Sequence, residues 1–232
     1  MEEIQIKAAD GSGSFSAYVA RPKSEPAPVV VVIQEIFGVN DAIRATCREM
    51  AEMGFIAVAP DLFWRLEPHV DLTDKSEAEW KKAFDLMNRF DQDKGIEDLK
   101  TTVAEARGMR GGNRRVGTIG FCLGGRLAFM MATRSDADVN VSYYGVGLEK
   151  LLPEIGNVKH PLVVHVAAKD EFSSDDARAA LVQGTKDHPQ IRTYMYPDVQ
   201  HAFARVNGIH YDRRAATIAN GRTAEALVEA LG

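Results

Sequence analysis

The stretch VGTIGFCLGGRLAFMMATR, residues 116–134, decides the fold of this chain. A β-branched and apolar run leads into Gly120-Phe121-Cys122-Leu123-Gly124, and a helical pattern follows at once. A reactive residue between two glycines at a strand-to-helix turn is typical of a nucleophile elbow, here with cysteine in the usual place of serine. Because the helix dipole at this position favours the thiolate, Cys122 is the candidate nucleophile. The alternative is a buried cysteine in a glycine-rich turn.

Length and composition indicate one globular domain over residues 1–232. The chain is 45% hydrophobic and 26% charged with a net charge of −5, which suits an α/β domain and disfavours a nucleic-acid partner. The longest apolar run, VVVVI at 29–33, is too short to span a membrane. With two cysteines and no signal-peptide pattern in MEEIQIK, we expect a cytoplasmic protein.

Strands and helices alternate along the chain, which predicts an α/β fold with a mainly parallel sheet of about eight strands flanked by helices. The predicted strands cover residues 4–6, 15–20, 29–35, 55–61, 116–120, 139–144, 162–167 and 191–196. The predicted helices cover residues 41–52, 76–90, 93–108, 123–134, 173–186 and 211–230, and residues 62–76 form a loop. Asn40 or Asp41 is expected to cap the first helix.

Four reactive side chains follow the ends of predicted strands: Glu35, Cys122, Asp170 and His201. Since the carboxyl ends of parallel strands meet at one edge of a sheet, we expect these side chains to converge. The order nucleophile, acid, histidine is that of the α/β-hydrolases. In this hypothesis Cys122 attacks an acyl carbonyl, His201 accepts its proton, and Asp170 orients the imidazole.

Other carboxylates and histidines compete for these roles. Glu171, Asp175 and Asp176 lie close to Asp170, but the last two follow two serines and are better explained as helix-capping acids. His165 lies inside a strand, where a core imidazole is expected. The remaining histidines lie in loops or open the last helix: His69, His160, His188 and His210.

The other cysteine and the pattern of ligand-type residues point away from a metal site. Cys47 falls on the inner stripe of the helix at 41–52 and is expected to be a core residue. The sequence contains no CxxC pair and no clustered Cys/His spacing, so it predicts no metal.

Several motifs together resemble the dienelactone hydrolase (carboxymethylenebutenolidase) family: QEIFGVN at 34–40, GFCLGG at 120–125, YYGVGLE at 143–149, Lys169-Asp170 and HAFAR at 201–205. They extend over nearly the whole chain with the family's spacing. The resemblance implies an α/β-hydrolase fold and a cytoplasmic, monomeric enzyme that needs no cofactor. It also implies hydrolysis of dienelactone to maleylacetate in the degradation of aromatic compounds, through a thioester on Cys122.

The resemblance also implies roles for residues around the nucleophile. Glu35 partners the resting thiol until substrate binding displaces it, because a carboxylate disfavours a neighbouring thiolate. The backbone N–H groups of Leu123 and Ile36 form the oxyanion hole. Arg205 binds the substrate carboxylate.

The remaining residues of the implied substrate-binding pocket are mostly aromatic, and some of them differ from those of well-known family members. Phe37 corresponds to an apolar wall, and Tyr143 is a candidate polar contact, although packing explains both equally well. Trp80 occupies the position of a second carboxylate-binding arginine in well-known members. Phe84 and Met87 replace family aromatics, and Ala202 replaces a serine, so the substrate-binding pocket is expected to be more apolar.

Three other functions compete with dienelactone hydrolysis. In the first, the chain is a hydrolase of the same family whose substrate is a bulkier or less charged ester or lactone. In the second the chain is a non-catalytic thiol-sensing or binding protein, which the presence of a full triad disfavours. A dinucleotide-binding protein is disfavoured because GFCLGG lacks the GxGxxG spacing and no Walker lysine follows.

Overall fold

A computed structural model describes residues 2–232. In chain order the elements are β1 (Glu2–Lys7), β2 (Ser14–Ala20), β3 (Ala27–Ile33), α1 (Asp41–Glu52), β4 (Ile56–Pro60), α2 (Glu77–Arg89), α3 (Gln92–Gly108), β5 (Gly112–Phe121), α4 (Leu123–Arg134), β6 (Val139–Tyr143), a 3-10 helix η1 (Leu148–Asn157), β7 (Leu162–Ala167), α5 (Asp175–Thr185), β8 (Ile191–Tyr196) and α6 (Arg213–Leu231).

The strands are ordered β1-β2-β4-β3-β5-β6-β7-β8. The pairs β1–β2 and β2–β4 are antiparallel, whereas β3–β4, β6–β7 and β7–β8 are parallel. The predicted α/β architecture of about eight strands in a mainly parallel sheet is therefore confirmed. The chain divides into two compact units, Met1–Thr118 and Ile119–Gly232, and β5 runs through the boundary. The single domain over 1–232 stays a prediction.

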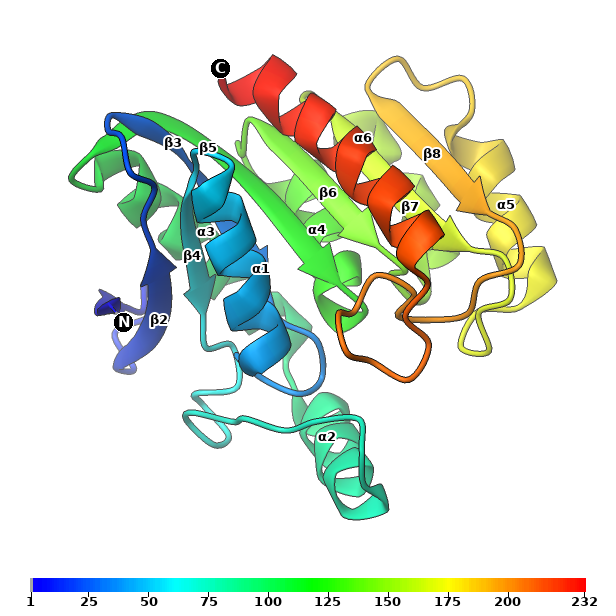
Figure 1. Ribbon diagram of the computed structural model, residues 1–232, viewed down its shortest axis with the longest axis horizontal. Helices are drawn as coiled ribbons and strands as arrows, with labels where there is room; N and C mark the ends of the chain where they lie inside the picture. Colours follow the sequence, from blue (N-terminus) through cyan, green and yellow to red (C-terminus); the bar gives the residue numbers. More distant parts are fainter. Residues whose placement is uncertain (1) are drawn as a thin grey trace. The chain divides into compact units, whose positions relative to one another are not determined.

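In the first unit, β3 is the centre of the core because residues 29–33 are completely buried. A continuous apolar strand of this kind needs cover on both faces, and α1 and α3 provide it (Figure 1). Asn40 rather than Asp41 caps α1, since its side chain accepts a hydrogen bond from the N–H of Ile43 at 3.2 Å.

In the second unit, α6 lies on one face of β6 and β7, and α4 lies on the other (Figure 1). Contacts beyond the strands continue the pairing of β7 and β8: the N–H of Ala168 donates to the carbonyl of Tyr196 at 3.0 Å, and that of Lys169 to Val199 at 2.9 Å. These two hydrogen bonds bring the segment after β7 beside the segment after β8. Both segments carry predicted site residues.

The structure differs from the predicted elements mainly in one added helix. The 3-10 helix η1 contains Pro153 and was absent from the prediction. α5 begins at Asp175 rather than at residue 173, because the Ser174 side chain caps it by accepting from the N–H of Ala177. Asp175 and Asp176 lie in the first turn of α5, where acidic side chains favour the helix N-terminus, as expected.

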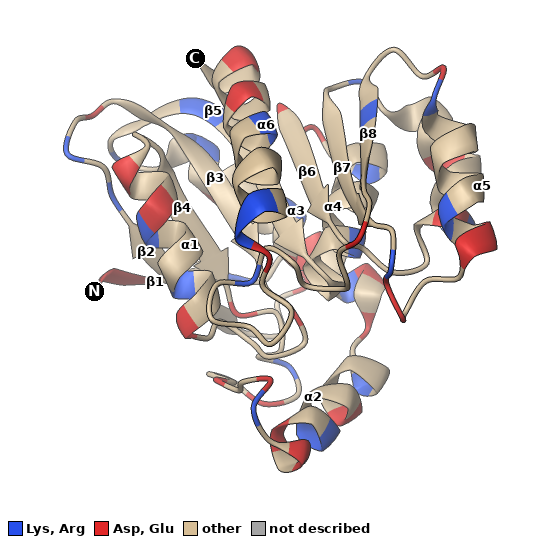
Figure 2. Ribbon diagram, turned by 45° about the vertical axis from the view of Figure 1, so that its right-hand side comes forward, with Lys and Arg blue, Asp and Glu red and all other residues tan. Residues whose placement is uncertain are grey.

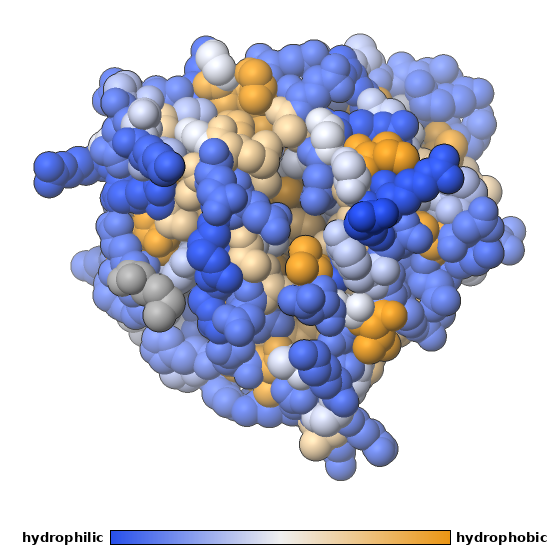
Figure 3. Space-filling view, in the orientation of Figure 1, coloured by the Kyte–Doolittle hydropathy of each residue, from blue (hydrophilic) through white to orange (hydrophobic). Residues whose placement is uncertain are grey.

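Charged residues of both signs are mixed along the helices. Acidic and basic residues are interspersed on α1, α2 and α5 (Figure 2). The face in Figure 3 is mostly hydrophilic, with a band of weakly hydrophobic residues through its upper centre and strongly hydrophobic residues in small separate groups. None of the helices in residues 2–232 is long and apolar enough to cross a membrane.

Candidate active site

Cys122 occupies the turn between β5 and α4, as predicted. Its backbone has φ +54° and ψ −114°, a conformation that costs a non-glycine residue about 1–3 kcal/mol and is typical of a nucleophile elbow. The N–H of Cys122 donates to the carbonyl of Tyr143 at 3.0 Å, which fixes the turn against the end of β6. The side chain is partly exposed, and the thiol is free.

Glycines make this turn possible. A Cβ atom on Gly120 would lie 1.9 Å from the carbonyl oxygen of Gly124, and one on Gly125 would lie 2.3 Å from that of Tyr143. Both neighbours are backbone atoms, so neither position accepts a side chain without displacement of the turn. Leu123 begins α4, so its N–H belongs to the first turn, whose donors have no partner within the helix. This N–H is thus chemically suited to an oxyanion hole.

His201 and Asp170, which are 31 residues apart, form the predicted acid–histidine pair. Nδ1 of His201 lies 2.8 Å from Oδ2 of Asp170, and each side chain is only 4% exposed. The second carboxylate oxygen, Oδ1, accepts a hydrogen bond from the N–H of Phe172 at 2.9 Å. Both oxygens of Asp170 are engaged, which fixes the carboxylate in the plane needed to hold the imidazole.

The surroundings of His201 favour the imidazolium. Burial opposes the charged form, but the neighbouring Cys122 and the hydrogen bond and charge of Asp170 together raise the pKa of His201 to about 10. Its other ring nitrogen, Nε2, is buried and makes no hydrogen bond of ordinary geometry with residues 2–232. Because Nδ1 is held by Asp170, Nε2 is the ring atom that exchanges a proton with the sulfur of Cys122.

Two aromatic rings that the sequence analysis did not single out pack on the imidazole. Tyr144 lies 5.1 Å from His201 at an interplanar angle of 64°, and Phe172 lies 4.9 Å away at 79°. Both are edge-to-face contacts, which restrict rotation of the ring. Tyr144 has φ +38° directly after β6, a distortion that no local sequence pattern announces.

The structure places Tyr143, predicted as a candidate substrate contact, in the core. The side chain is completely buried, and its hydroxyl lies 2.6 Å from Oγ1 of Thr223 and donates to Oδ1 of Asn220 at 2.9 Å. Both partners belong to α6. Tyr143 therefore packs in the core and acts on the site through its backbone carbonyl, which holds Cys122.

The competing residues have structural roles, as expected. His165 is completely buried, with Nδ1 2.9 Å from the Tyr196 hydroxyl and Nε2 3.0 Å from Oγ1 of Thr223. Burial and the charge of Arg222 lower the pKa of His165 to about 3, so it is neutral. Cys47 is also completely buried, and burial raises the pKa of its thiol.

Arg205 lies in the loop after His201. Its side chain is buried. Its backbone N–H donates to the carbonyl of Ala202 at 3.0 Å, in a tight turn where Ala202 has φ +62°. A buried guanidinium four residues after the histidine suits recognition of a carboxylate. Its role in binding substrate stays a prediction.

The first unit contains the other predicted site residues. Glu35, Ile36 and Phe37 are almost completely buried, so Glu35 is not a solvated charge at a strand end. Trp80 on α2 meets the Phe37 ring edge-to-face at 5.0 Å and stacks on Phe84 at 5.5 Å. These three rings, Phe37, Trp80 and Phe84, form an aromatic cluster, and the prediction that Glu35 converges with the nucleophile stays a prediction.

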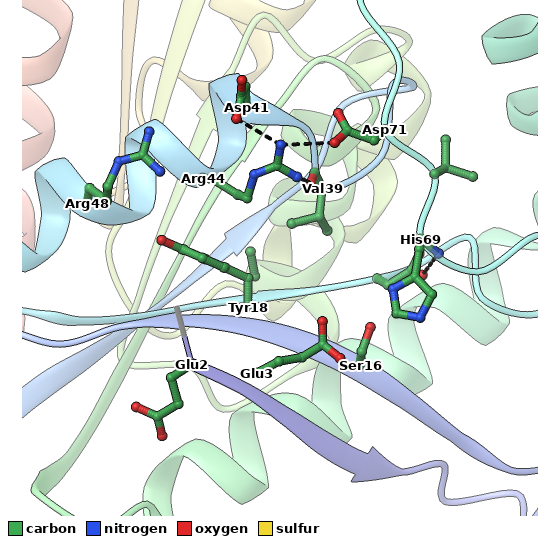
Figure 4. A pocket seen from close by; sticks show the side chains of 13 residues that line it. Glu2, Glu3, Ser16, Tyr18, Val39, Asp41, Arg44, Arg48, His69 and Asp71 are labelled. Carbon is green, nitrogen blue, oxygen red and sulfur yellow. Dashed lines mark hydrogen bonds and ion pairs between the residues drawn. The ribbon is translucent and has the colours of Figure 1, made fainter.

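A groove of about 430 Å³ in the first unit contains another set of triad-type residues (Figure 4). Ser16, Asp61 and His69 line it. However, the Asp61 carboxylate accepts from main-chain N–H groups, one of them that of His69 at 2.7 Å, and not from the imidazole. Arg44 in the same groove is already paired with two aspartates (Figure 4). The groove thus lacks the arrangement that activates a nucleophile.

Comparisons with known proteins identify the family of the chain. The model of the dienelactone hydrolase family matches residues 15–231. A protein of Azospirillum brasilense with the provisional name carboxymethylenebutenolidase is 49% identical over 234 residues, covering 100% of both chains. Carboxymethylenebutenolidase 1 of Cupriavidus pinatubonensis is 38% identical over 224 residues, covering 97% of this chain and 95% of its own.

A solved structure supports the fold. A provisionally named dienelactone hydrolase of Klebsiella pneumoniae superposes with a TM-score of 0.84 at 24% identity, covering 98% of each chain. The family model and the carboxymethylenebutenolidase relatives indicate a hydrolase that acts on ester or lactone bonds. The chain belongs to the dienelactone hydrolase family.

Proposed function

We propose that this hydrolase opens the lactone ester of dienelactone to give maleylacetate, with Cys122, His201 and Asp170 as its catalytic triad. The observation that carries the proposal is the buried His201–Asp170 pair, in which Nδ1 lies 2.8 Å from Oδ2 and Cys122 is close enough to raise the pKa of the imidazole. A cysteine at a strand-to-helix turn beside an imidazole that a carboxylate holds has the arrangement of a nucleophile–base pair. The relatives named carboxymethylenebutenolidase support the choice of substrate.

The reaction proceeds in two acyl-transfer steps. His201 takes the proton of the Cys122 thiol, and the sulfur attacks the lactone carbonyl carbon. Collapse of the tetrahedral intermediate breaks the bond to the ring oxygen, which takes the proton from His201 and leaves as an enol. Water then gives a proton to His201 and attacks the thioester, and the thiol is restored as the acid product departs. The enol tautomerises to the ketone of maleylacetate.

Other residues support these steps in the proposal. The N–H groups of Leu123 and Ile36 stabilise the oxyanion. Glu35 holds the resting thiol and releases it when substrate binds, and Arg205 binds the substrate carboxylate. We also infer that the protein acts in the cytoplasm, since both cysteines are free thiols, and, from its resemblance to the family, that it acts as a monomer.

The aromatic cluster of Phe37, Trp80 and Phe84 favours a second candidate substrate. The indole N–H of Trp80 donates to the carbonyl of Asp74 at 3.0 Å, so the ring presents apolar surface rather than a hydrogen-bond donor. Without a second cation, affinity for a carboxylate falls by about 10- to 100-fold. A bulkier or less charged ester is therefore the alternative substrate of the same triad.

The test is kcat/KM on dienelactone beside a neutral aryl ester, with the Cys122→Ala variant as control. We expect a preference for dienelactone that is lost in the variant. Preference for the neutral ester with the same loss would retain the triad and replace the substrate. Full activity of the Cys122→Ala variant would refute the mechanism.

A thiol-sensing function predicts a different outcome. A sensor cysteine is alkylated at the same rate whether or not His201 is present. A triad cysteine is expected to lose most of its reactivity toward iodoacetamide in a His201→Ala variant, because no base then accepts its proton.

A further inference from the structure

Arg178 is a buried arginine beside the acid of the candidate triad. It lies on α5, and its side chain is only 8% exposed. Arginine is almost never buried unless its charge is matched by partners. The proposed reaction gives this side chain no role.

The guanidinium binds both ends of a short loop after β7. Its Nη1 donates to the carbonyl of Asp170 at 2.9 Å and also to the carbonyl of Ser173. Its Nη2 donates to the carboxylate of Asp175. The N–H of Ser173 reaches the Asp170 carbonyl at 3.3 Å, so the loop 170–173 is closed mainly through Arg178.

The same loop determines where the Asp170 carboxylate lies. Its Oδ1 accepts from the N–H of Phe172 within the loop, and its Oδ2 meets Nδ1 of His201. Arg178 touches the main chain of Asp170 rather than its carboxylate, so it acts on the position of this residue. Displacement of the loop would move the carboxylate away from the imidazole and release the Phe172 ring that packs on it.

We propose that Arg178 is a positioning residue, which holds the main chain of residues 170–173 so that Asp170 orients His201. This inference rests on the proposed function of the triad. The planar guanidinium binds the two carbonyl oxygens through Nη1 and the Asp175 carboxylate through Nη2, a fixed arrangement of donors that the single ammonium of lysine does not reproduce. We therefore expect the position of Asp170 to change both when methionine removes the hydrogen-bond donors of Arg178 and when lysine replaces the planar guanidinium.

The first experiment compares Arg178→Met and Arg178→Lys with the unchanged protein in ester hydrolysis. We expect kcat to fall by about 10- to 100-fold in both variants, with KM nearly unchanged, because a misplaced catalytic group costs rate rather than binding. Arg192→Met is the matched control. Arg192 lies on β8, is 58% exposed and is 3.7 Å from Glu229, so its loss should leave kcat as it is.

A double-mutant cycle separates positioning from general stability. Asp170→Asn alone is expected to lower kcat by about 10³- to 10⁴-fold. If Arg178 acts through Asp170, adding Arg178→Met to this variant changes kcat no further. Additive losses of kcat would overturn the proposal, because they would mean that Arg178 acts somewhere other than on Asp170. An unchanged kcat in the single variants Arg178→Met and Arg178→Lys would also overturn it.

A spectroscopic measurement reads the same geometry without substrate. The proton on Nδ1 of His201 in its short bond to Asp170 gives a downfield proton NMR signal, which should move upfield or vanish in both Arg178 variants and persist in Arg192→Met. An unchanged signal in both would refute positioning. If Cys122→Ala and Asp170→Asn keep full activity, the proposed function fails instead, and the NMR signal still decides whether Arg178 holds Asp170.

Discussion

Replacement of Gly120 by alanine tests whether the nucleophile depends on the tightness of its turn. The new methyl carbon would lie 1.9 Å from the Gly124 carbonyl oxygen, whereas ordinary contact begins at 3.4 Å. The backbone beside Cys122 must therefore move by about 1.5 Å. Since a misplacement of about 1 Å can cost a factor of about 10² in rate, we expect kcat to fall at least about 100-fold. Overpacking of this kind also lowers the free energy of unfolding by about 1–3 kcal/mol.

The assay measures kcat on an aryl ester, the rate of Cys122 alkylation and the melting temperature. Gly221→Ala is the control, because Gly221 lies in α6 with nothing within 4 Å of the added carbon. There we expect unchanged activity and a gain of about 0.5–1 kcal/mol in stability, as for other helical glycines. A Gly120→Ala protein with kcat within about twofold of the unchanged enzyme would refute the reasoning, since an effect that small is far below the cost of a displaced nucleophile.

Four further outcomes are expected. Tyr143→Phe should lower the free energy of unfolding by about 1–2 kcal/mol, through lost buried hydrogen bonds, and leave KM unchanged; a raised KM in steady-state kinetics would restore it as a substrate contact. The free energy of unfolding should be greatest near pH 6.5, the ordinary pKa of histidine. The pKa of His201 is raised to about 10 in the folded protein, so its stabilising contribution is lost as pH rises from 6.5 through 10. The pKa of His165 is lowered to about 3, so its contribution is lost as pH falls from 6.5 through 3. Calorimetry at a series of pH values checks this, and the alkaline decline should disappear in a His201→Ala variant. Glu35→Gln should lower kcat more than it weakens binding if the glutamate gates the thiol, and unchanged kcat contradicts the gate. Arg205→Lys should raise KM for dienelactone by about 10- to 100-fold and scarcely affect a neutral ester; equal effects on both substrates would mean that Arg205 does not read the carboxylate.

Much of the fold was predictable because its signals are local. The helices at 41–52 and 123–134 and the strands at 162–167 and 191–196 have the predicted bounds, since apolar periodicity and capping residues act over a few positions. The sequence did not predict the 3-10 helix η1, because Pro153 interrupts the helical pattern in this segment.

The aromatic residues at the end of β6 illustrate the limit of local patterns. Tyr143 and Tyr144 are adjacent, and sequence alone gave no reason to prefer the second. Successive side chains of a strand point to opposite faces, and the register of β6 turns Tyr143 toward α6. The positive φ of Tyr144 then places its ring on His201.

By itself the sequence determined the elbow at Cys122, the order of nucleophile, acid and histidine, and the family. Those features depend on glycines and strand and helix patterns within short segments. Only the tertiary structure decided that Asp170 meets His201 at 2.8 Å, that Arg178 holds the Asp170 loop, and that Tyr143 is a core residue. The reason is physical: Asp170 and His201, like Tyr143 and its partner Thr223, are far apart in the chain, and hydrogen bonds beyond β7 and β8 bring the segments of Asp170 and His201 together. Arg178 is only eight residues from Asp170, but no local pattern shows which carbonyl groups a buried guanidinium meets.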